Sequence, residues 1–271
     1  MKNKLLETYS DKTYSTNREK ITSRIELVRI DNKDNNIKNE SYRILNFKYE
    51  YLFKDYKILI REMKNQFGEL LKDMKELKKV LVVGLGNKEI VCDSLGAKVV
   101  NKLLLLDDKN EYKTNCVING IIPNVLGITG IPSFDIIAGV TNQIKPDLVI
   151  CIDSLSASIY DNLFQSIQIS NGSITAGSGV KNLTNKTISQ KTLKTPVLIL
   201  GIPTLISLEN IINSLCECEN QNFKNNDVWL SPKDVDFAIE EFSYIFSKSL
   251  NEFFYPEIQP KDIEIMVKGI F

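Results

Sequence analysis

Two short, uninterrupted apolar runs constrain the fold of this chain more than any other feature. They cover residues 80–83 and 148–152. A strand that is covered on both faces is apolar throughout, whereas a half-exposed strand alternates apolar and polar residues. Segments with helical periodicity lie between and after these runs. We therefore predict an α/β fold, a three-layer sandwich with a mostly parallel central sheet and helices on both faces.

Further elements follow from the same patterns. Apolar residues at three- and four-residue spacing predict helices over residues 55–78, 133–143, 204–216 and 232–254, and Asp93 opens another that extends to residue 106. Additional strands are predicted over residues 165–169 and 196–200.

The N-terminal part of the chain has a different pattern. Residues 24–30 and 43–51 alternate apolar and polar side chains around a turn-forming cluster, which predicts a small antiparallel hairpin. Residues 1–22 are polar and predicted to be a flexible segment. We expect residues 23–271 to form a single domain.

Composition excludes several classes of site. The chain has no histidine, so it cannot form a Ser-His-Asp triad, a Cys-His pair or a His-ligated zinc site. Its 34 basic residues balance 34 acidic ones, and this balance predicts no direct nucleic-acid partner and no membrane partner. Five scattered cysteines without a CxxC pair suit a reducing compartment. Neither a signal peptide nor a spanning helix is predicted, so we expect a cytoplasmic protein. We also expect no cofactor and no metal.

Candidate site residues cluster where predicted strands end. Asp93 and Asp153 follow the two apolar runs, and ligands of such sheets gather at the carboxyl ends of strands. Carboxylates are then the natural carriers of acid–base chemistry. Simpler interpretations stay open: Asp93 as a helix cap, and Asp153 as a cap of the following turn.

Three glycine-containing loops belong to the same predicted rim: residues 84–87, 176–180 and 201–203. The first resembles part of a dinucleotide fingerprint, but Glu89 occupies the third glycine position, so the signal is weak. The second can cradle an anion or be a plain turn. Its Ser178 lacks a histidine partner, which leaves only Lys181 as an activating base.

Several motifs in one order resemble the spore germination protease family. They are Val82-Val-Gly-Leu-Gly-Asn87, Asp93-Ser-Leu-Gly96, Gly127-Ile-Thr-Gly130, Ser133-Phe-Asp-Ile-Ile-Ala-Gly139, Lys145-Pro-Asp-Leu-Val-Ile-Cys-Ile-Asp-Ser-Leu155, Gln168-Ile-Ser170, Gly177-Ser-Gly-Val180 and Leu200-Gly-Ile-Pro-Thr204. The resemblance runs from about residue 24 to about residue 255 and implies a fold like that of hydrogenase-maturation proteases. It also implies an endopeptidase that degrades small acid-soluble, DNA-coating spore proteins at germination. Such a protein is expected to be a homotetramer in the spore core or forespore, made as a zymogen, with residues 1–22 a possible propeptide remnant.

By this resemblance, Asp93 and Asp153 are the catalytic pair. Two neighbouring carboxylates resist double ionisation, so one can activate water while the other donates a proton. Asn87 and the loop of Gly177, Ser178 and Gly179 are expected to position the substrate or stabilise the oxyanion.

Two alternatives remain open. Ala97 replaces a usual proline and Thr175-Ala176 a usual His-Pro, and the N-terminal stretch lacks the processing sequence typical of the family. These departures allow a weak or inactive paralogue that acts as a sporulation binding protein. The second alternative is a metal-dependent variant in which both aspartates bind a hard divalent ion.

Overall fold

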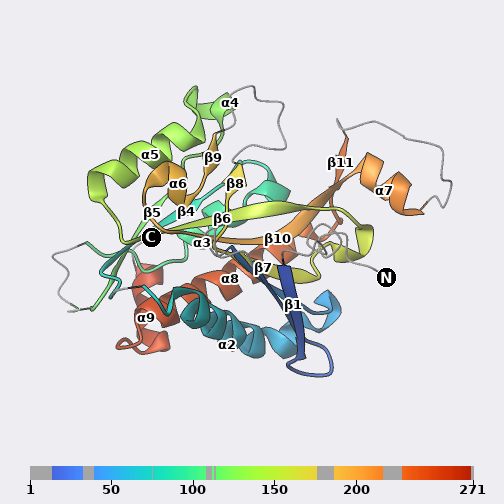
Figure 1. Ribbon diagram of the computed structural model, residues 1–271, viewed down its shortest axis with the longest axis horizontal. Helices are drawn as coiled ribbons and strands as arrows, with labels where there is room; N and C mark the ends of the chain where they lie inside the picture. Colours follow the sequence, from blue (N-terminus) through green and yellow to red (C-terminus); the bar gives the residue numbers. More distant parts are fainter. Residues whose placement is uncertain are drawn as a thin grey trace.

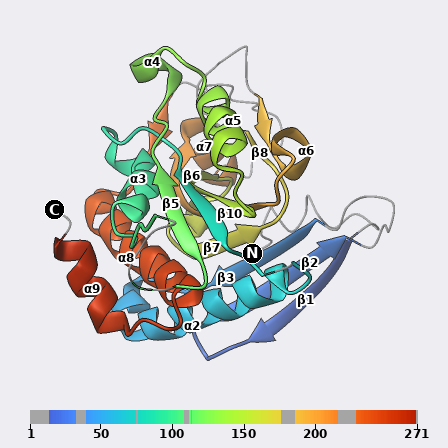
Figure 2. The same cartoon turned by 90° about the vertical axis from the view of Figure 1, so that its left-hand side faces the viewer.

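A nine-stranded mixed sheet organises the protein. The computed structural model describes residues 14–32, 40–74, 76–107, 112, 114–175, 186–215 and 228–269. Within these ranges the strand order is β1-β2-β3-β7-β10-β6-β4-β5, and β11 pairs with β10 beside this path. Figures 1 and 2 show the sheet between two groups of helices.

Four neighbouring strands form the parallel part of the sheet. They are β4 (Lys79–Gly84), β5 (Val117–Ile121), β6 (Leu148–Ala157) and β10 (Val197–Ser207). In β4 and β6, alternate side chains enter two different cores: Val82 and Ile150 contact one cluster, and Val83 and Cys151 contact the other. Both faces of these strands are therefore buried, which is why the sequence runs are apolar throughout.

The rest of the sheet is antiparallel. β1 (Tyr14–Lys20) pairs with β2 (Glu26–Asn32), which pairs with β3 (Ser41–Asn46). β7 (Ser166–Ser170) then joins β3 to β10, and β11 (Trp229–Leu230) adds to the far end of β10.

Helices cover both faces. On one side lie α2 (Leu52–Leu71), α3 (Leu95–Val100), α8 (Val235–Phe254) and α9 (Pro260–Gly269), and on the other α5 (Ser133–Ile144) and α6 (Gln190–Leu193). In Figure 2, α2, α8 and α9 lie below the sheet and α5 lies above it. The shorter elements are η1 (Tyr49–Tyr51), η2 (Val91–Asp93), α4 (Leu126–Thr129), η3 (Tyr160–Asn162), β8 (Ile174–Thr175), β9 (Thr187–Ile188) and α7 (Leu208–Leu215).

The α/β class, the covering helices and the N-terminal hairpin are confirmed, with the parallel pairing confined to β10, β6, β4 and β5. Several boundaries were wrong. The strand predicted over residues 43–51 ends at Asn46, with Tyr49–Tyr51 in η1, and the helix predicted over residues 55–78 ends at Leu71. Residues 204–207 belong to β10 because β6 extends beside them as a partner. The helix after Asp93 ends at Val100, because the following segment bonds to α8 instead: Leu104 N–H donates to Asn251 Oδ1 at 3.0 Å.

The N-terminal segment also differs from expectation. Residues 14–20, expected to be flexible, form β1, which pairs with β2 along its full length. Residues 1–13 lie outside the described part of the chain.

Tyr255 supplies a test of how α8 is anchored to the sheet. Its fully buried hydroxyl accepts from Ile118 N–H at 2.9 Å and donates to Leu104 O at 3.0 Å. Tyr255→Phe leaves both buried backbone groups unpaired, so we expect it to lower the free energy of unfolding by roughly 1–3 kcal/mol. Denaturant unfolding measures this loss. The matched control, Tyr160→Phe at a 56% exposed tyrosine, should change little; equal effects would contradict the anchoring role.

Candidate active site

The strand order reverses between β4 and β6. From β4 the chain moves outward to β5 and then returns to β6 on the other side of β4. The crevice at such a switch point, outside the carboxyl ends of the strands, is the usual ligand site of open α/β sheets. Asp93 follows β4 and Asp153 lies on β6 at this position, so the topology brings the two predicted carboxylates to the same edge of the sheet.

A tight turn positions the Asp93 side chain. Gly86 adopts φ +94°, and a Cβ there would lie 2.1 Å from Asp93 O and 2.8 Å from Asp93 Oδ1. Only glycine combines this backbone conformation with such a close approach. The neighbouring Asn87 N–H donates to Asp93 Oδ2 at 2.7 Å. The carboxylate therefore folds back onto the β4 turn and does not cap α3.

Asp153 lies one residue beyond the point where β4 and β6 stop pairing, at Gly84–Ile152. On its other side β6 stays paired with β10, where Asp153 faces Gly201. A Cβ at Gly201 would lie 2.8 Å from Asp153 O and 2.6 Å from Leu155 Cγ, so a larger residue would displace this part of β6. Asp153 Oδ1 accepts a hydrogen bond from Ser154 N–H at 2.9 Å.

The two carboxyl groups have different electrostatic environments. Burial, together with the negative charge of Asp93, raises the pKa of Asp153 to about 7. Burial also raises the pKa of Asp93, but the hydrogen bond from Asn87 N–H opposes this rise. Near neutral pH, Asp153 therefore retains a proton more readily than Asp93.

A hydrogen-bond chain from distant segments holds the Asp93 turn. The fully buried Thr204 on β10 donates from Oγ1 to Cys92 O at 2.7 Å. Ser231, just after β11, donates from Oγ to Thr204 O at 2.6 Å. Sequence reasoning placed residues 204–216 in a helix and missed this role; the only available signal was the position of Thr204 at the end of the Leu200–Thr204 motif.

The other predicted site residues have different outcomes. The Asn87 side-chain oxygen accepts from Glu89 N–H at 3.0 Å and so closes a local turn; its predicted role at the oxyanion stays a prediction. Gly177, Ser178 and Gly179 lie outside the described residues. No group of three or more metal-binding side chains occurs within the described ranges.

Comparison with known proteins identifies the family. A family model described as germination protease matches residues 13–218. The chain belongs to the germination protease family. The germination protease of Clostridium tetani is 33% identical over 221 residues, which cover 68% of each chain. That of Priestia megaterium is 42% identical over 137 residues, 48% of this chain and 37% of the relative. Membership supports a peptidase role for this chain in spores.

Among the described helices, none is both long and apolar enough to cross a membrane.

The raised pKa of Asp153 predicts a pH dependence of stability. Between about pH 4 and pH 7 the Asp153 carboxyl holds a proton in the folded state that it has released in the unfolded chain. The folded state therefore binds more protons than the unfolded state. The contribution of Asp153 to the free energy of unfolding should therefore decrease as pH rises through this window, by up to about 1.4 kcal/mol per pH unit.

Denaturant unfolding at several pH values measures this slope. We expect Asp153→Asn to flatten it, whereas Asp161→Asn, at an exposed position, should retain it. Identical profiles for wild type and Asp153→Asn would show that the Asp153 carboxyl has an ordinary environment.

Proposed function

We propose that this chain is an endopeptidase in which Asp93 and Asp153 together activate water for peptide hydrolysis. What supports this most is the position of Asp93 and Asp153 at the carboxyl ends of β4 and β6, near enough for the charge of Asp93 to raise the pKa of Asp153. Like-charged carboxylates that share a site separate into one acid and one base, as required for acid–base catalysis by a chain without histidine.

In the proposed reaction Asp93 is the ionised partner. Its carboxylate removes a proton from water while the water oxygen attacks the scissile carbonyl carbon. Protonated Asp153 hydrogen-bonds the carbonyl oxygen and stabilises its developing negative charge. Asp153 then donates its proton to the amide nitrogen, the C–N bond breaks and the amine leaves, while the proton that Asp93 took from water keeps one proton on the pair. Cleavage yields one new carboxyl terminus and one new amino terminus.

The surroundings of Asp93 favour a polypeptide substrate. Ile90 and Val91, directly before the Asp93 turn, are 49% and 43% exposed. Trp229 and Leu230 on β11 are also exposed, and the Ser231–Thr204–Cys92 hydrogen-bond chain connects β11 to the same turn. Exposed apolar side chains around a polar centre are typical of sites that bind peptide side chains.

The substrate class and assembly come from the family resemblance. We propose small acid-soluble, DNA-coating spore proteins as substrates, degraded at germination in the spore core. A homotetramer with a removable N-terminal segment is part of the same proposal. Asn87 and the loop of Gly177, Ser178 and Gly179 would position the scissile carbonyl.

Isosteric replacement of either aspartate tests the mechanism. We expect Asp93→Asn and Asp153→Asn each to lower kcat/KM for a small acid-soluble spore protein by roughly 100- to 10,000-fold, because each removes one proton-transfer step. Mass spectrometry of the fragments measures cleavage, and thermal unfolding verifies folding. Asp161→Asn is the matched control. Turnover retained in either aspartate variant would exclude the paired-carboxylate mechanism.

The same assay separates the two alternatives. Wild-type activity that survives exhaustive chelation excludes a metal-dependent reaction, whereas loss restored by a divalent cation supports one. Binding of the spore protein without any cleavage by the wild type would identify an inactive paralogue.

A further inference from the structure

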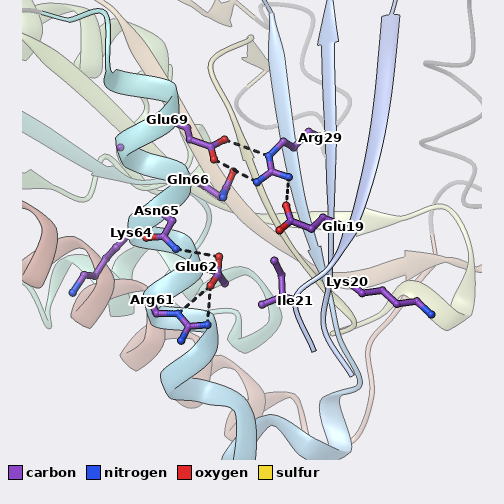
Figure 3. Close-up of a pocket in the computed structure, with 11 residues that line it drawn as sticks. Glu19, Lys20, Ile21, Arg29, Arg61, Glu62, Lys64, Asn65, Gln66 and Glu69 are labelled. Carbon is purple, nitrogen blue, oxygen red and sulfur yellow. Dashed lines mark hydrogen bonds and ion pairs between the residues drawn. The ribbon is translucent and has the colours of Figure 1, made fainter. Parts of the chain in front are cut away.

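A groove separates α2 from the N-terminal hairpin, away from the Asp93 turn. Its volume is about 720 Å³, within the range of small-ligand sites. One wall is formed by the end of β1, with Glu19 and Ile21, and the other by the α2 face that carries Glu62 and Gln66. Figure 3 shows these side chains converging between helix and strands.

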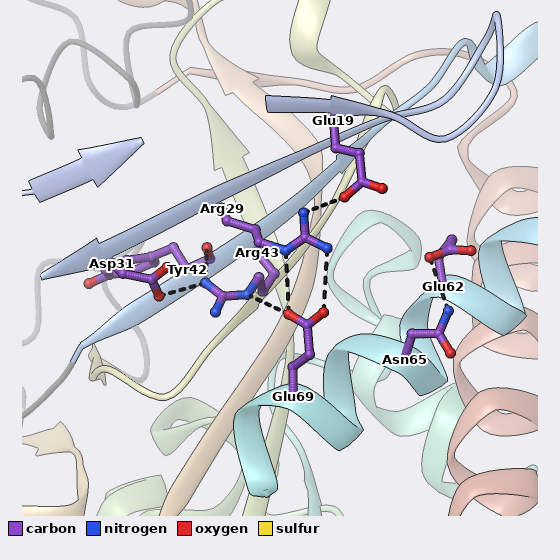
Figure 4. Close-up of polar contacts among 8 residues, drawn as sticks. All are labelled: Glu19, Arg29, Asp31, Tyr42, Arg43, Glu62, Asn65 and Glu69. Atoms are coloured by element: carbon purple, nitrogen blue, oxygen red, sulfur yellow. Dashed lines mark hydrogen bonds and ion pairs between the residues drawn. The ribbon is translucent and has the colours of Figure 1, made fainter. Parts of the chain in front are cut away.

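The cations around this groove are already paired or turned away. Arg29 contacts Glu19 at 2.6 Å and Glu69 at 3.3 Å, which fixes its guanidinium between two carboxylates (Figure 4). Lys64 pairs with Glu252 at 2.8 Å and points away from the hairpin, and Lys20 also points outward (Figure 3). Little positive charge is therefore left for an anionic ligand.

The floor of the groove contains acceptors that are incompletely satisfied. Gln66 is 1% exposed, and its Oε1 has no hydrogen-bond partner among the described residues. A buried acceptor without a donor costs roughly 1–3 kcal/mol. A ligand that donates a hydrogen bond to Gln66 Oε1 would remove this cost.

Glu62 lies one turn before Gln66 on the same face of α2. Glu62 is 6% exposed, and within the described ranges its carboxylate has helix neighbours as partners: Arg61 at 3.0 Å and Asn65 at 3.2 Å. The Arg61 side chain is 62% exposed, so its displacement from Glu62 costs little. Glu62 is thus a shielded negative charge whose cation can be exchanged.

Gly68 leaves space beside these acceptors. It lies inside α2, where glycine is less favourable than alanine by roughly 0.8–1 kcal/mol. A Cβ at this position would meet nothing within 4 Å. Packing within the chain therefore does not require glycine here, and its absent side chain enlarges the groove.

We propose that this groove binds an alkylammonium group, which replaces Arg61 at the Glu62 carboxylate and donates a second hydrogen bond to Gln66 Oε1. The methylene stem of the ligand lies along Ile21 and the open surface at Gly68. A lysine side chain of another polypeptide and a free polyamine both carry this chemistry. The site does not depend on the chemistry of Asp93 and Asp153.

Calorimetric titration of the full chain at low ionic strength tests the site. Spermidine serves as the free amine, acetyl-Gly-Lys-Gly-amide as the lysine probe, and acetyl-Gly-Gln-Gly-amide as the neutral control. Binding of spermidine alone identifies a polyamine site, and binding of the lysine peptide identifies a protein ligand. Absence of binding by both amines at millimolar concentration overturns the proposal.

Variants test which atoms bind the amine. We expect Glu62→Gln to weaken binding about tenfold or more, because a charge-assisted hydrogen bond is lost. Gln66→Met should also weaken it while leaving the melting temperature unchanged or raised, since an unpaired acceptor is removed. Arg61→Ala should strengthen binding a few-fold, because the competing cation is gone.

Two further variants keep the test decisive. Gly68→Ala should raise thermal stability and yet weaken binding, so a loss of binding cannot be attributed to unfolding. The control Glu76→Gln removes an exposed carboxylate elsewhere and should leave affinity within about twofold. Equal weakening by Glu62→Gln and Glu76→Gln would reveal general attraction to acidic protein and overturn the proposed site.

Discussion

The early end of the pairing between β4 and β6 is the constraint on which the candidate site depends. The two strands pair from Val80–Leu148 to Gly84–Ile152, and β4 then leaves the sheet. β6 continues to Ala157 because β10 stays paired on its other side. One edge of β6 is consequently open from Asp153 onward, and the turn that carries Asp93 occupies the space beside it. Continued pairing would have closed the crevice with main chain.

This asymmetry also explains why two chemically identical side chains differ. Asp153 is part of a strand covered by neighbours, and among the described residues its carboxylate accepts from the N–H of the next residue. Asp93 lies on a turn whose geometry points the Asn87 N–H at its carboxylate. Burial raises the pKa of both carboxyl groups; the Asn87 N–H opposes this rise at Asp93, whereas the charge of Asp93 adds to it at Asp153. The proposed assignment of Asp153 as acid and Asp93 as base thus rests on where the strands end, not on residue type.

Much of the central fold could be predicted from the sequence, because the pattern of apolar residues along the chain matches the side chains that are buried there. The apolar runs at 80–83 and 148–152 are typical of strands covered on both faces. Predictions failed where an element depends on a distant partner. The polar residues of β1 (Tyr14–Lys20) form a strand only through pairing with β2, and β5 contains Asn119 and Gly120, which mask its strand character. Strand propensity is weak enough for such tertiary pairing to override it.

The site shows the same division. The two aspartates could be found because Asp153 directly follows one apolar run and Asp93 lies ten residues after the other, but the groups that hold Asp93 could not. Thr204 contacts Cys92 across 112 positions of sequence, and Ser231 reaches Thr204 from beyond a segment outside the described residues. Thr204 lies in β10 where the register with β6 shifts between Pro203 and Leu205. Pro203 cannot donate to the ladder, so an irregularity is expected there, and that irregularity accompanies the contact of Thr204 with the Asp93 turn. The Leu200–Thr204 motif is therefore an element of the sheet that positions one half of the carboxylate pair and pairs directly with the strand that carries the other.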